Sequence, residues 1–253
     1  MYREEFTQTS RMLDKEMHLV IYGERGLPIL AFPTQDGLCR QLEDFGMIDQ
    51  IADFIDSGRI QVFVVDSVDP ESWSMKDGDP AWRAARQEQY FQYITEEAVP
   101  FIRSRNSLPP AVFGCSMGAN HTLITFLRRP DLFCGMIALS GVYDTDFFFG
   151  GWMDSTLYDS SPERFLPNMP ADHPYIALYN ERKMILCCGQ GAWEEDSVRT
   201  LRRLERVFGE KGIRAWCDFW GYDVNHDWPW WFKQIRYFLP FVLGDNDYMI
   251  AKS

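Results

Sequence analysis

The chain has 253 residues, of which 46% are hydrophobic and 25% are charged, with a formal net charge of −12. This composition excludes a disordered chain, and the acidic balance argues against binding nucleic acid or an anionic membrane, since neutralising phosphates needs a basic patch. The first seventeen residues hold no apolar stretch. No apolar run approaches the roughly 20 residues that span a bilayer, so neither a signal peptide nor a membrane span is expected.

The six cysteines are not spaced in the pairs that bind metals. Most lie in apolar, strand-like contexts, which favours buried thiols in a reducing cytoplasm. We therefore expect a cytoplasmic protein with no metal and no organic cofactor. The six positions are Cys39, Cys115, Cys134, Cys187, Cys188 and Cys217.

Short apolar runs alternate with longer amphipathic ones along the chain. Several runs, such as Ile60–Asp66, are mostly apolar without a polar alternation, which is typical of strands buried on both faces of a parallel sheet. The predicted strands are Met17–Tyr22, Pro28–Phe32, Ile60–Asp66, Ala111–Gly114, Gly135–Ser140, Met184–Gly189 and Ala215–Trp220.

Between these strands, apolar residues recur at the three-to-four spacing of a helix face. Alternating strands and helices predict an α/β fold, a mostly parallel sheet with helices on both faces, in one domain over 1–253. Gly212 is expected to end the second of these helices. The three faces are Tyr90, Tyr93, Ile94, Ala98, Phe101 and Ile102; Val198, Leu201, Leu204 and Phe208; and Trp231, Ile235, Phe238 and Val242.

Residues 143–181 break the alternation, because they are rich in aromatic residues, Pro and Asp and show little periodicity. The segment is too long for an ordinary loop and too short for a separate domain. We expect an irregular excursion over the active-site face.

A G-x-S-x-G motif runs from Gly114 to Gly118, after a short apolar strand and before an amphipathic helix expected at Thr122–Arg129. This context predicts a nucleophile elbow, a strand–turn–helix in which Ser116 takes a strained conformation and points its hydroxyl above the sheet. The two glycines let strand and helix approach closely. The helix N-terminus behind Ser116 favours developing negative charge.

A serine hydroxyl needs a base to remove its proton, and in this arrangement the acid and then the histidine follow the serine along the chain. Of the four histidines, His18 precedes the serine, His121 lies on the elbow helix facing elsewhere, and His173 lies in the excursion. His226 lies between the last strand and the last helix, which predicts it as the base.

The acid should follow the penultimate strand, where Glu194, Glu195 and Asp196 stand in a row. Acids also suit a helix N-terminus, and we expect that helix to begin near Ser197. Glu194 then stays in a loop behind a flexible Gly-Gln-Gly turn and is favoured, with Glu195 and Asp196 left open.

An oxyanion hole needs two backbone N–H groups, one from the residue after the nucleophile, here Met117, and one from the loop after an early strand. In that loop Gln35 is the first candidate and Thr34 the alternative, while Pro33 has no N–H to donate. Pocket-lining aromatic residues are predicted at Trp73, Tyr143, Trp152 and Trp228, each equally compatible with core packing. Arg83 and Arg86 are candidates for binding an anionic acyl group, although surface charge on a helix is favoured.

These pieces together resemble the esterase D-like family of α/β-hydrolases, which includes S-formylglutathione hydrolases, feruloyl and acetylxylan esterases, enterochelin esterases and mycolyltransferases. The resemblance covers nearly the whole chain. Two departures stand out: the early loop reads Phe32-Pro-Thr-Gln35 instead of the common His-Gly, and the acid is Glu instead of Asp. The matching stretches are Asp66–Trp73, Glu96–Ile102, Ser140–Asp144 with Ser161-Pro162, Gly191–Glu194 and His226–Trp228.

The resemblance implies an α/β-hydrolase fold and hydrolysis of a carboxylic ester, small or carbohydrate-linked, through an acyl-enzyme on Ser116. Transfer of the acyl group to a sugar or thiol uses the same residues, because water exclusion decides between the two outcomes. A catalytically silent fold that binds a ligand is the remaining alternative. The expected partner is a small-molecule ester, and a homo-oligomer is left open.

Overall fold

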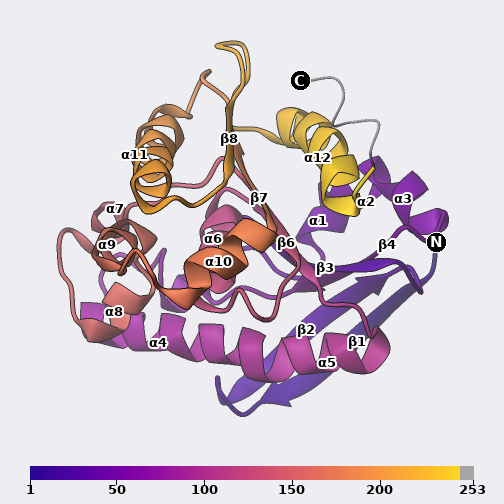
Figure 1. Cartoon of the computed structure of the whole chain (residues 1–253). Coiled ribbons are helices and arrows are strands. Elements are labelled where there is room, and N and C mark those ends of the chain that lie inside the picture. Colours follow the sequence, from indigo (N-terminus) through magenta and orange to yellow (C-terminus); the bar gives the residue numbers. More distant parts are fainter. Residues whose placement is uncertain (246–253) are drawn as a thin grey trace.

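A computed structural model describes residues 1–245, whose strands form one eight-stranded sheet in the order β1-β2-β4-β3-β5-β6-β7-β8 (Figure 1). The strands are β1 (Arg3–Ser10), β2 (Lys15–Tyr22), β3 (Leu27–Phe32), β4 (Ile60–Val65), β5 (Ala111–Cys115), β6 (Gly135–Leu139), β7 (Lys183–Cys188) and β8 (Trp216–Phe219). The helices are α1 (Gln41–Asp44), α2 (Met47–Gln50), α3 (Ala52–Asp56), η1 (Asp69–Glu71), α4 (Pro80–Tyr93), η2 (Ile94–Ala98), α5 (Val99–Arg105), α6 (Met117–Arg128), α7 (Thr145–Phe149), α8 (Ser155–Asp159), α9 (Pro162–Asn168), α10 (Pro174–Glu181), α11 (Glu195–Lys211) and α12 (Trp228–Leu243).

The seven predicted strands are all present, and from β4 to β8 each neighbouring pair is parallel. The carboxyl ends of these strands therefore meet at one edge of the sheet, where ligands bind in open α/β sheets. The eighth strand, β1, was not predicted. It pairs antiparallel with β2 at the sheet edge, and its sequence REEFTQTS is largely polar and exposed, so it carries no apolar run.

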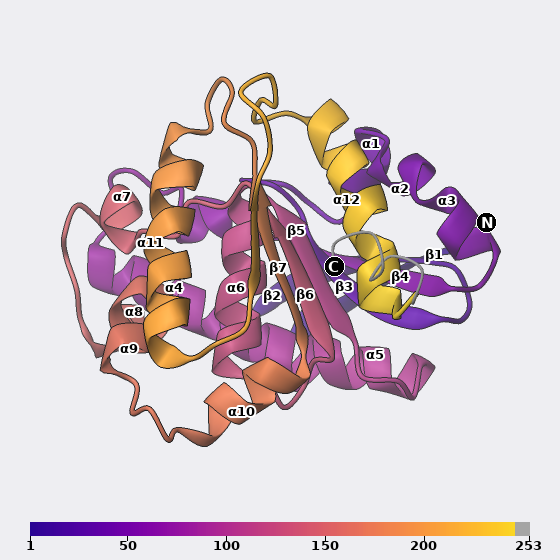
Figure 2. The same cartoon turned by 45° about the horizontal axis from the view of Figure 1, so that its top comes forward.

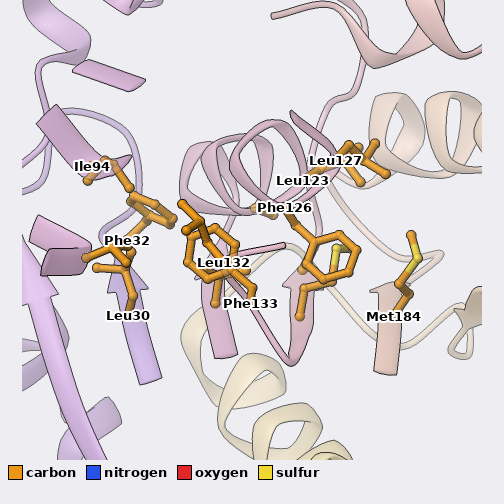
Figure 3. Close-up of a cluster of buried hydrophobic side chains, with 14 of the residues drawn as sticks. Leu30, Phe32, Ile94, Leu123, Phe126, Leu127, Leu132, Phe133 and Met184 are labelled. Carbon is orange, nitrogen blue, oxygen red and sulfur yellow. The ribbon is translucent and has the colours of Figure 1, made fainter. Parts of the chain in front are cut away.

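Alternate residues of the central strands point into two separate hydrophobic cores. In β6, Met136 and Ala138 belong to the core beneath α4, α6 and α11, whereas Ile137 and Leu139 belong to the core beneath α1–α3 and α12. Figure 2 shows the sheet between these two helix layers. The first core, drawn in Figure 3, packs Leu123, Phe126 and Leu127 of α6 against the sheet. Burial of both faces explains why β4 is buried throughout and is apolar at every position but Gln61.

The predicted helix faces are confirmed, with two local features. The helix over residues 80–105 contains one π-helical turn, η2, directly before Pro100. Pro100 has no N–H and its ring crowds the carbonyl four residues earlier, and a wider turn relieves both effects. Gly212 ends α11 with a φ of 68°, as predicted. Within residues 1–245, no helix combines the length and the apolar character needed to cross a membrane.

Residues 143–181 differ from the irregular excursion that was expected, because they form four short helices, α7 to α10. Helices this short, each begun by a Pro or an Asp cap, have too few turns for a visible apolar period. Only the start of the segment reaches the active-site edge. Further along, α9 packs on α11 and α10 packs on β7.

Candidate active site

Ser116 lies in the turn between β5 and α6 with φ 56° and ψ −122°, a conformation that L-residues rarely adopt. Its N–H donates to the carbonyl oxygen of Leu139 at 2.8 Å, which ties the turn to β6. A Cβ on Gly114 would lie 2.2 Å from the carbonyl oxygen of Gly118, and one on Gly118 would lie 2.5 Å from that of Pro33. Both motif glycines are therefore required by close backbone approach.

His226 reaches Ser116 from the loop between β8 and α12. Its Nε2 lies 2.9 Å from Ser116 Oγ, and its Nδ1 lies 3.4 Å from Glu194 Oε2. The ring of Trp231 meets the imidazole edge-on, with ring centroids 5.0 Å apart. The geometry allows Nε2 to accept the serine proton while Nδ1 faces a carboxylate, which is the arrangement a general base needs.

Glu194 is fully buried, with 0% of its surface exposed. Its Oε1 accepts hydrogen bonds from Ser140 Oγ at 2.5 Å and from the Gly189 N–H at 3.2 Å, which leaves Oε2 for His226. Helix α11 begins at Glu195, two residues before the predicted start at Ser197. The error has little consequence for Glu194, because this residue still precedes the helix and its side chain turns toward His226 instead of capping.

Glu195 and Asp196 occupy the first turn of α11, where acids suit the helix dipole. Asp196 Oδ1 pairs with Arg199 on the next turn of the helix. Neither contacts His226 by a hydrogen bond or ion pair in the described part of the chain.

Ser140 is the site residue that the sequence reasoning missed. It follows β6 with a φ of 55°, is fully buried, and accepts a hydrogen bond from Trp231 Nε1 at 3.0 Å while donating to Glu194. Its position at the carboxyl end of a parallel strand was the available signal, since that edge carries the site. The sequence analysis placed it at the end of a predicted strand and at the start of a family-like stretch, without a role in the site.

The loops that carry Glu194 and His226 lie against each other. His226 N–H donates to the Ala192 carbonyl at 3.0 Å, and Gly191 N–H to the Val224 carbonyl at 2.8 Å. A Cβ on Gly189 would lie 2.0 Å from the Val224 carbonyl oxygen, and one on Gly191 2.3 Å from Asn225 Oδ1. The Gly-Gln-Gly turn therefore serves close packing of two loops, not the flexibility that was expected.

Met117 and Gln35, whose backbone N–H groups are the predicted oxyanion donors, are both among the residues that line the depression at Ser116. The alternative donor, Thr34, is already committed, because its N–H donates to Gln41 Oε1 at 2.7 Å. Asp36 N–H likewise donates to Asp69 Oδ2 at 3.1 Å. Among residues 1–245, no acceptor engages the Gln35 N–H, so this group is available to a ligand.

The depression above Ser116 has a volume of about 400 Å³. None of the four aromatic residues predicted to line it does so. Its lining is Gln35, Ser116, Met117, Asn120, Val142, Phe147, Phe148, Trp193, Glu195, Asp196 and His226.

Those four aromatic residues serve packing. Trp73 and Tyr143 are buried and line a separate small cavity. Trp73 also donates to Gln87 Oε1 at 2.8 Å. Trp152 stacks on Phe149, and Trp228 on Phe45. The aromatic part of the depression comes instead from Phe147, Phe148 and Trp193.

Two other titratable residues near the motif, His121 and Cys115, take no part in the proposed triad. His121 is buried, with Nε2 2.7 Å from Asp69 Oδ1 on the far side of α6. Burial, with a smaller effect of the Glu194 carboxylate, holds the pKa of the Cys115 thiol well above its usual range, so that the neighbouring thiol stays protonated and inert.

The two arginines considered for an anionic acyl group also lie away from the depression. Arg83 is buried, not a surface charge, and donates to the carbonyls of Ser72, Trp73 and Phe148. Arg86 pairs with Glu71.

Comparison with known proteins agrees with this geometry. A family model named Esterase and described as "Putative esterase" matches residues 10–241. A search of curated proteins gives no match. Similar solved structures include a ferulic acid esterase (16% identity, covering 96% of this chain and 97% of that one, TM-score 0.74). They also include S-formylglutathione hydrolase from Staphylococcus aureus (15% identity, 96% and 96%, TM-score 0.66) and MPT51 from Mycobacterium tuberculosis (14% identity, 96% and 98%, TM-score 0.68).

These structures share the fold of this chain over nearly its whole length, which confirms the predicted α/β-hydrolase fold and the resemblance to esterase D-like proteins. The family model covers most of the chain. The chain therefore belongs to the Esterase family and is a serine ester hydrolase.

Proposed function

We propose that this protein hydrolyses a small or carbohydrate-linked carboxylic ester with Ser116 as nucleophile, His226 as general base and Glu194 as the acid that orients the imidazole. One observation carries the proposal: Nε2 of His226 lies 2.9 Å from Oγ of a serine held at a strained elbow. The buried Glu194 carboxylate on the Nδ1 side supports the acid role.

In the first half-reaction, His226 Nε2 takes the proton of Ser116 as Oγ bonds to the ester carbonyl carbon. Negative charge develops on the carbonyl oxygen, and the N–H groups of Met117 and Gln35 stabilise it. The tetrahedral intermediate collapses as the bond to the alcohol oxygen breaks, and the imidazolium gives its proton to the leaving alcohol. Water then attacks the acyl carbon as His226 Nε2 takes its proton. The bond between the acyl carbon and Ser116 Oγ breaks, the imidazolium returns the proton to Oγ, and the carboxylic acid leaves.

Glu194 stays ionised throughout and stabilises the imidazolium. The two hydrogen bonds to Oε1 hold this carboxylate in place while Oε2 faces the ring. We also propose a cytoplasmic location. The six cysteines form no disulfide with one another, and four of them are buried, which supports a reducing compartment.

A fluorophosphonate probe tests the proposal directly, because it labels only an activated serine. We expect labelling at Ser116 and hydrolysis of p-nitrophenyl acetate by the wild-type protein. Both should vanish in Ser116→Ala and persist in Ser107→Ala, which removes an exposed serine. Labelling or wild-type turnover in a folded Ser116→Ala protein would rule Ser116 out.

A further inference from the structure

The depression above Ser116 carries negative charge on one side. Glu195 and Asp196 line it, together with the triad imidazole. Neither Lys nor Arg contributes to this lining within the described chain. Glu195 is exposed and forms no ion pair with any residue from 1 to 245, so its charge is uncompensated by a neighbouring cation.

The nearest arginines do not supply the missing positive charge. Arg199 bridges Asp196 and Asp144, two carboxylates for one guanidinium. Arg83 lies behind Phe148, with its guanidinium hydrogen-bonded to backbone carbonyls and stacked on Phe149 at 4.2 Å. The positive end of the α11 dipole faces the two acids of its own first turn. A chain of net charge −12 reinforces this negative field.

Exposed aromatic side chains also line the depression. Trp193 is 84% exposed and Phe147 is 57% exposed, which is unusual for large apolar side chains. Trp193 also has a φ of 67°, a costly conformation for a tryptophan. It directly precedes the anchored Glu194, so the acid loop holds the indole outward beside the depression. The face of an indole attracts cations electrostatically.

We propose that this depression selects esters by charge: it accepts uncharged esters, binds cationic ones better, and rejects those with a carboxylate or phosphate near the ester. The inference rests on the proposed esterase function and adds the substrate class. Glu195 and Trp193 are the residues that determine this selectivity. We therefore expect S-formylglutathione, which carries two carboxylates and one ammonium group, to be a poor substrate.

Three acetate esters of similar size test the proposal. They are 2-(trimethylammonio)ethyl acetate, its uncharged isostere 3,3-dimethylbutyl acetate, and the anionic 3-acetoxypropanoate. At low ionic strength we expect kcat/KM to be about fivefold higher for the cationic ester than for its isostere, and about fivefold lower for the anion. Salt should compress both ratios, because it screens exposed charges.

Single substitutions then test which residues produce the charge preference. Glu195→Gln and Trp193→Ala should each lower the ratio of cationic to uncharged rates by about threefold. Glu210→Gln makes the same charge change at the opposite, exposed end of α11, and should keep the wild-type ratio. An anionic ester turned over as well as its uncharged counterpart, or a ratio unmoved in both depression variants, would overturn the proposal.

Binding to the Ser116→Ala protein separates this proposal from the proposed function. Titration of each intact ester, followed through the indole N–H resonance of Trp193, reports charge preference without turnover. If fluorophosphonate labelling fails but the cationic ester still binds more tightly than the uncharged one, the esterase function is lost and the charge selectivity stands. Equal binding of all three esters would refute the selectivity even in an active enzyme.

Discussion

Two buried glutamates in this protein accept similar hydrogen bonds through one carboxylate oxygen and differ in the surroundings of the other oxygen. Glu194, at 0% exposed, uses Oε1 to accept from the Ser140 hydroxyl and the Gly189 N–H. Glu163, at 2% exposed, uses Oε1 to accept from the hydroxyl and the N–H of Thr145. The second oxygen of Glu194 faces His226, whereas that of Glu163 makes no hydrogen bond.

The comparison shows that burial with two hydrogen bonds to one oxygen is a structural motif that by itself implies no chemistry. At Glu163 it ties α9 to the start of α7, and burial raises the pKa of the carboxyl. At Glu194 the same anchoring leaves an oxygen for an imidazole that touches a serine. The partner of the free oxygen, not the burial of the acid, separates a catalytic candidate from a structural one.

The largest expected effect appears when two single variants are compared, each with one of these glutamates changed to glutamine. Glu194→Gln should lower kcat for p-nitrophenyl acetate about a thousandfold or more, because the amide cannot stabilise the imidazolium and favours the wrong tautomer. Glu163→Gln should leave kcat unchanged. Steady-state kinetics of both variants decides the comparison, with Glu195→Gln and Asp196→Asn as neighbours in sequence. A large kcat loss in either neighbour but not in Glu194→Gln would move the acid by one or two residues.

Removing the hydroxyl beneath each carboxylate should sharpen the contrast. Ser140→Ala deletes the donor to Glu194 Oε1 and the acceptor for Trp231 Nε1, so kcat should fall about tenfold, as expected for loss of a hydrogen bond to a charged group. Thr145→Val deletes the equivalent donor at Glu163 and should leave kcat at the wild-type value. Equal kcat values in the two variants would show that Ser140 does not position the acid.

The loop of Glu194 depends on a glycine, which gives a third test. In Gly191→Ala the new Cβ would meet Asn225 Oδ1 and the Val224 carbonyl, so the loop must shift at a cost of about 1–3 kcal/mol in stability. Because the shift moves Glu194 relative to His226, kcat should fall as well. Gly209→Ala lies within α11 with open space around its Cβ and should instead stabilise by about 0.5–1 kcal/mol. Denaturant unfolding of both variants checks that the free energy of unfolding falls in Gly191→Ala and rises in Gly209→Ala.

The smallest effect concerns stability and pH at Glu163. Burial, aided by Asp144, raises the pKa of this carboxyl above the ordinary value of 4.5. Between that unfolded-state value and the raised folded value, the native protein binds more protons than the unfolded chain, so stability falls as pH rises through this window. Glu163→Gln removes the effect, because glutamine does not ionise.

We therefore expect Glu163→Gln to be more stable than the wild type at pH 7.5, where the wild type must keep a buried carboxylate ionised. The difference should shrink toward zero below pH 4.5, where glutamate is protonated in both states. Urea unfolding at the two pH values measures it. A variant that is less stable than the wild type at pH 7.5 would mean that the ionised carboxylate is stabilised where it stands.

Local sequence patterns were enough to predict several parts of this protein. Continuous apolar runs revealed the buried strands, and the glycines around Ser116 revealed the elbow, because backbone approach there admits no side chain. Chain order and loop position selected His226 and Glu194, which lie next to each other in the structure, with His226 also in contact with Ser116. The polar edge strand β1 stayed hidden, since an exposed strand needs no apolar period.

The aromatic lining of the depression and the anchoring of Glu194 depend on contacts between distant parts of the chain. Trp73 and Phe147 are both aromatic residues outside the predicted strands and helices, yet one is buried and hydrogen-bonded to Gln87 and the other is exposed at the rim. Ser140 touches Glu194 across 54 positions of sequence, and Gly191 abuts a loop more than 30 residues later. Such contacts depend on which strand ends meet at the sheet edge, a property of the assembled sheet that no local pattern contains.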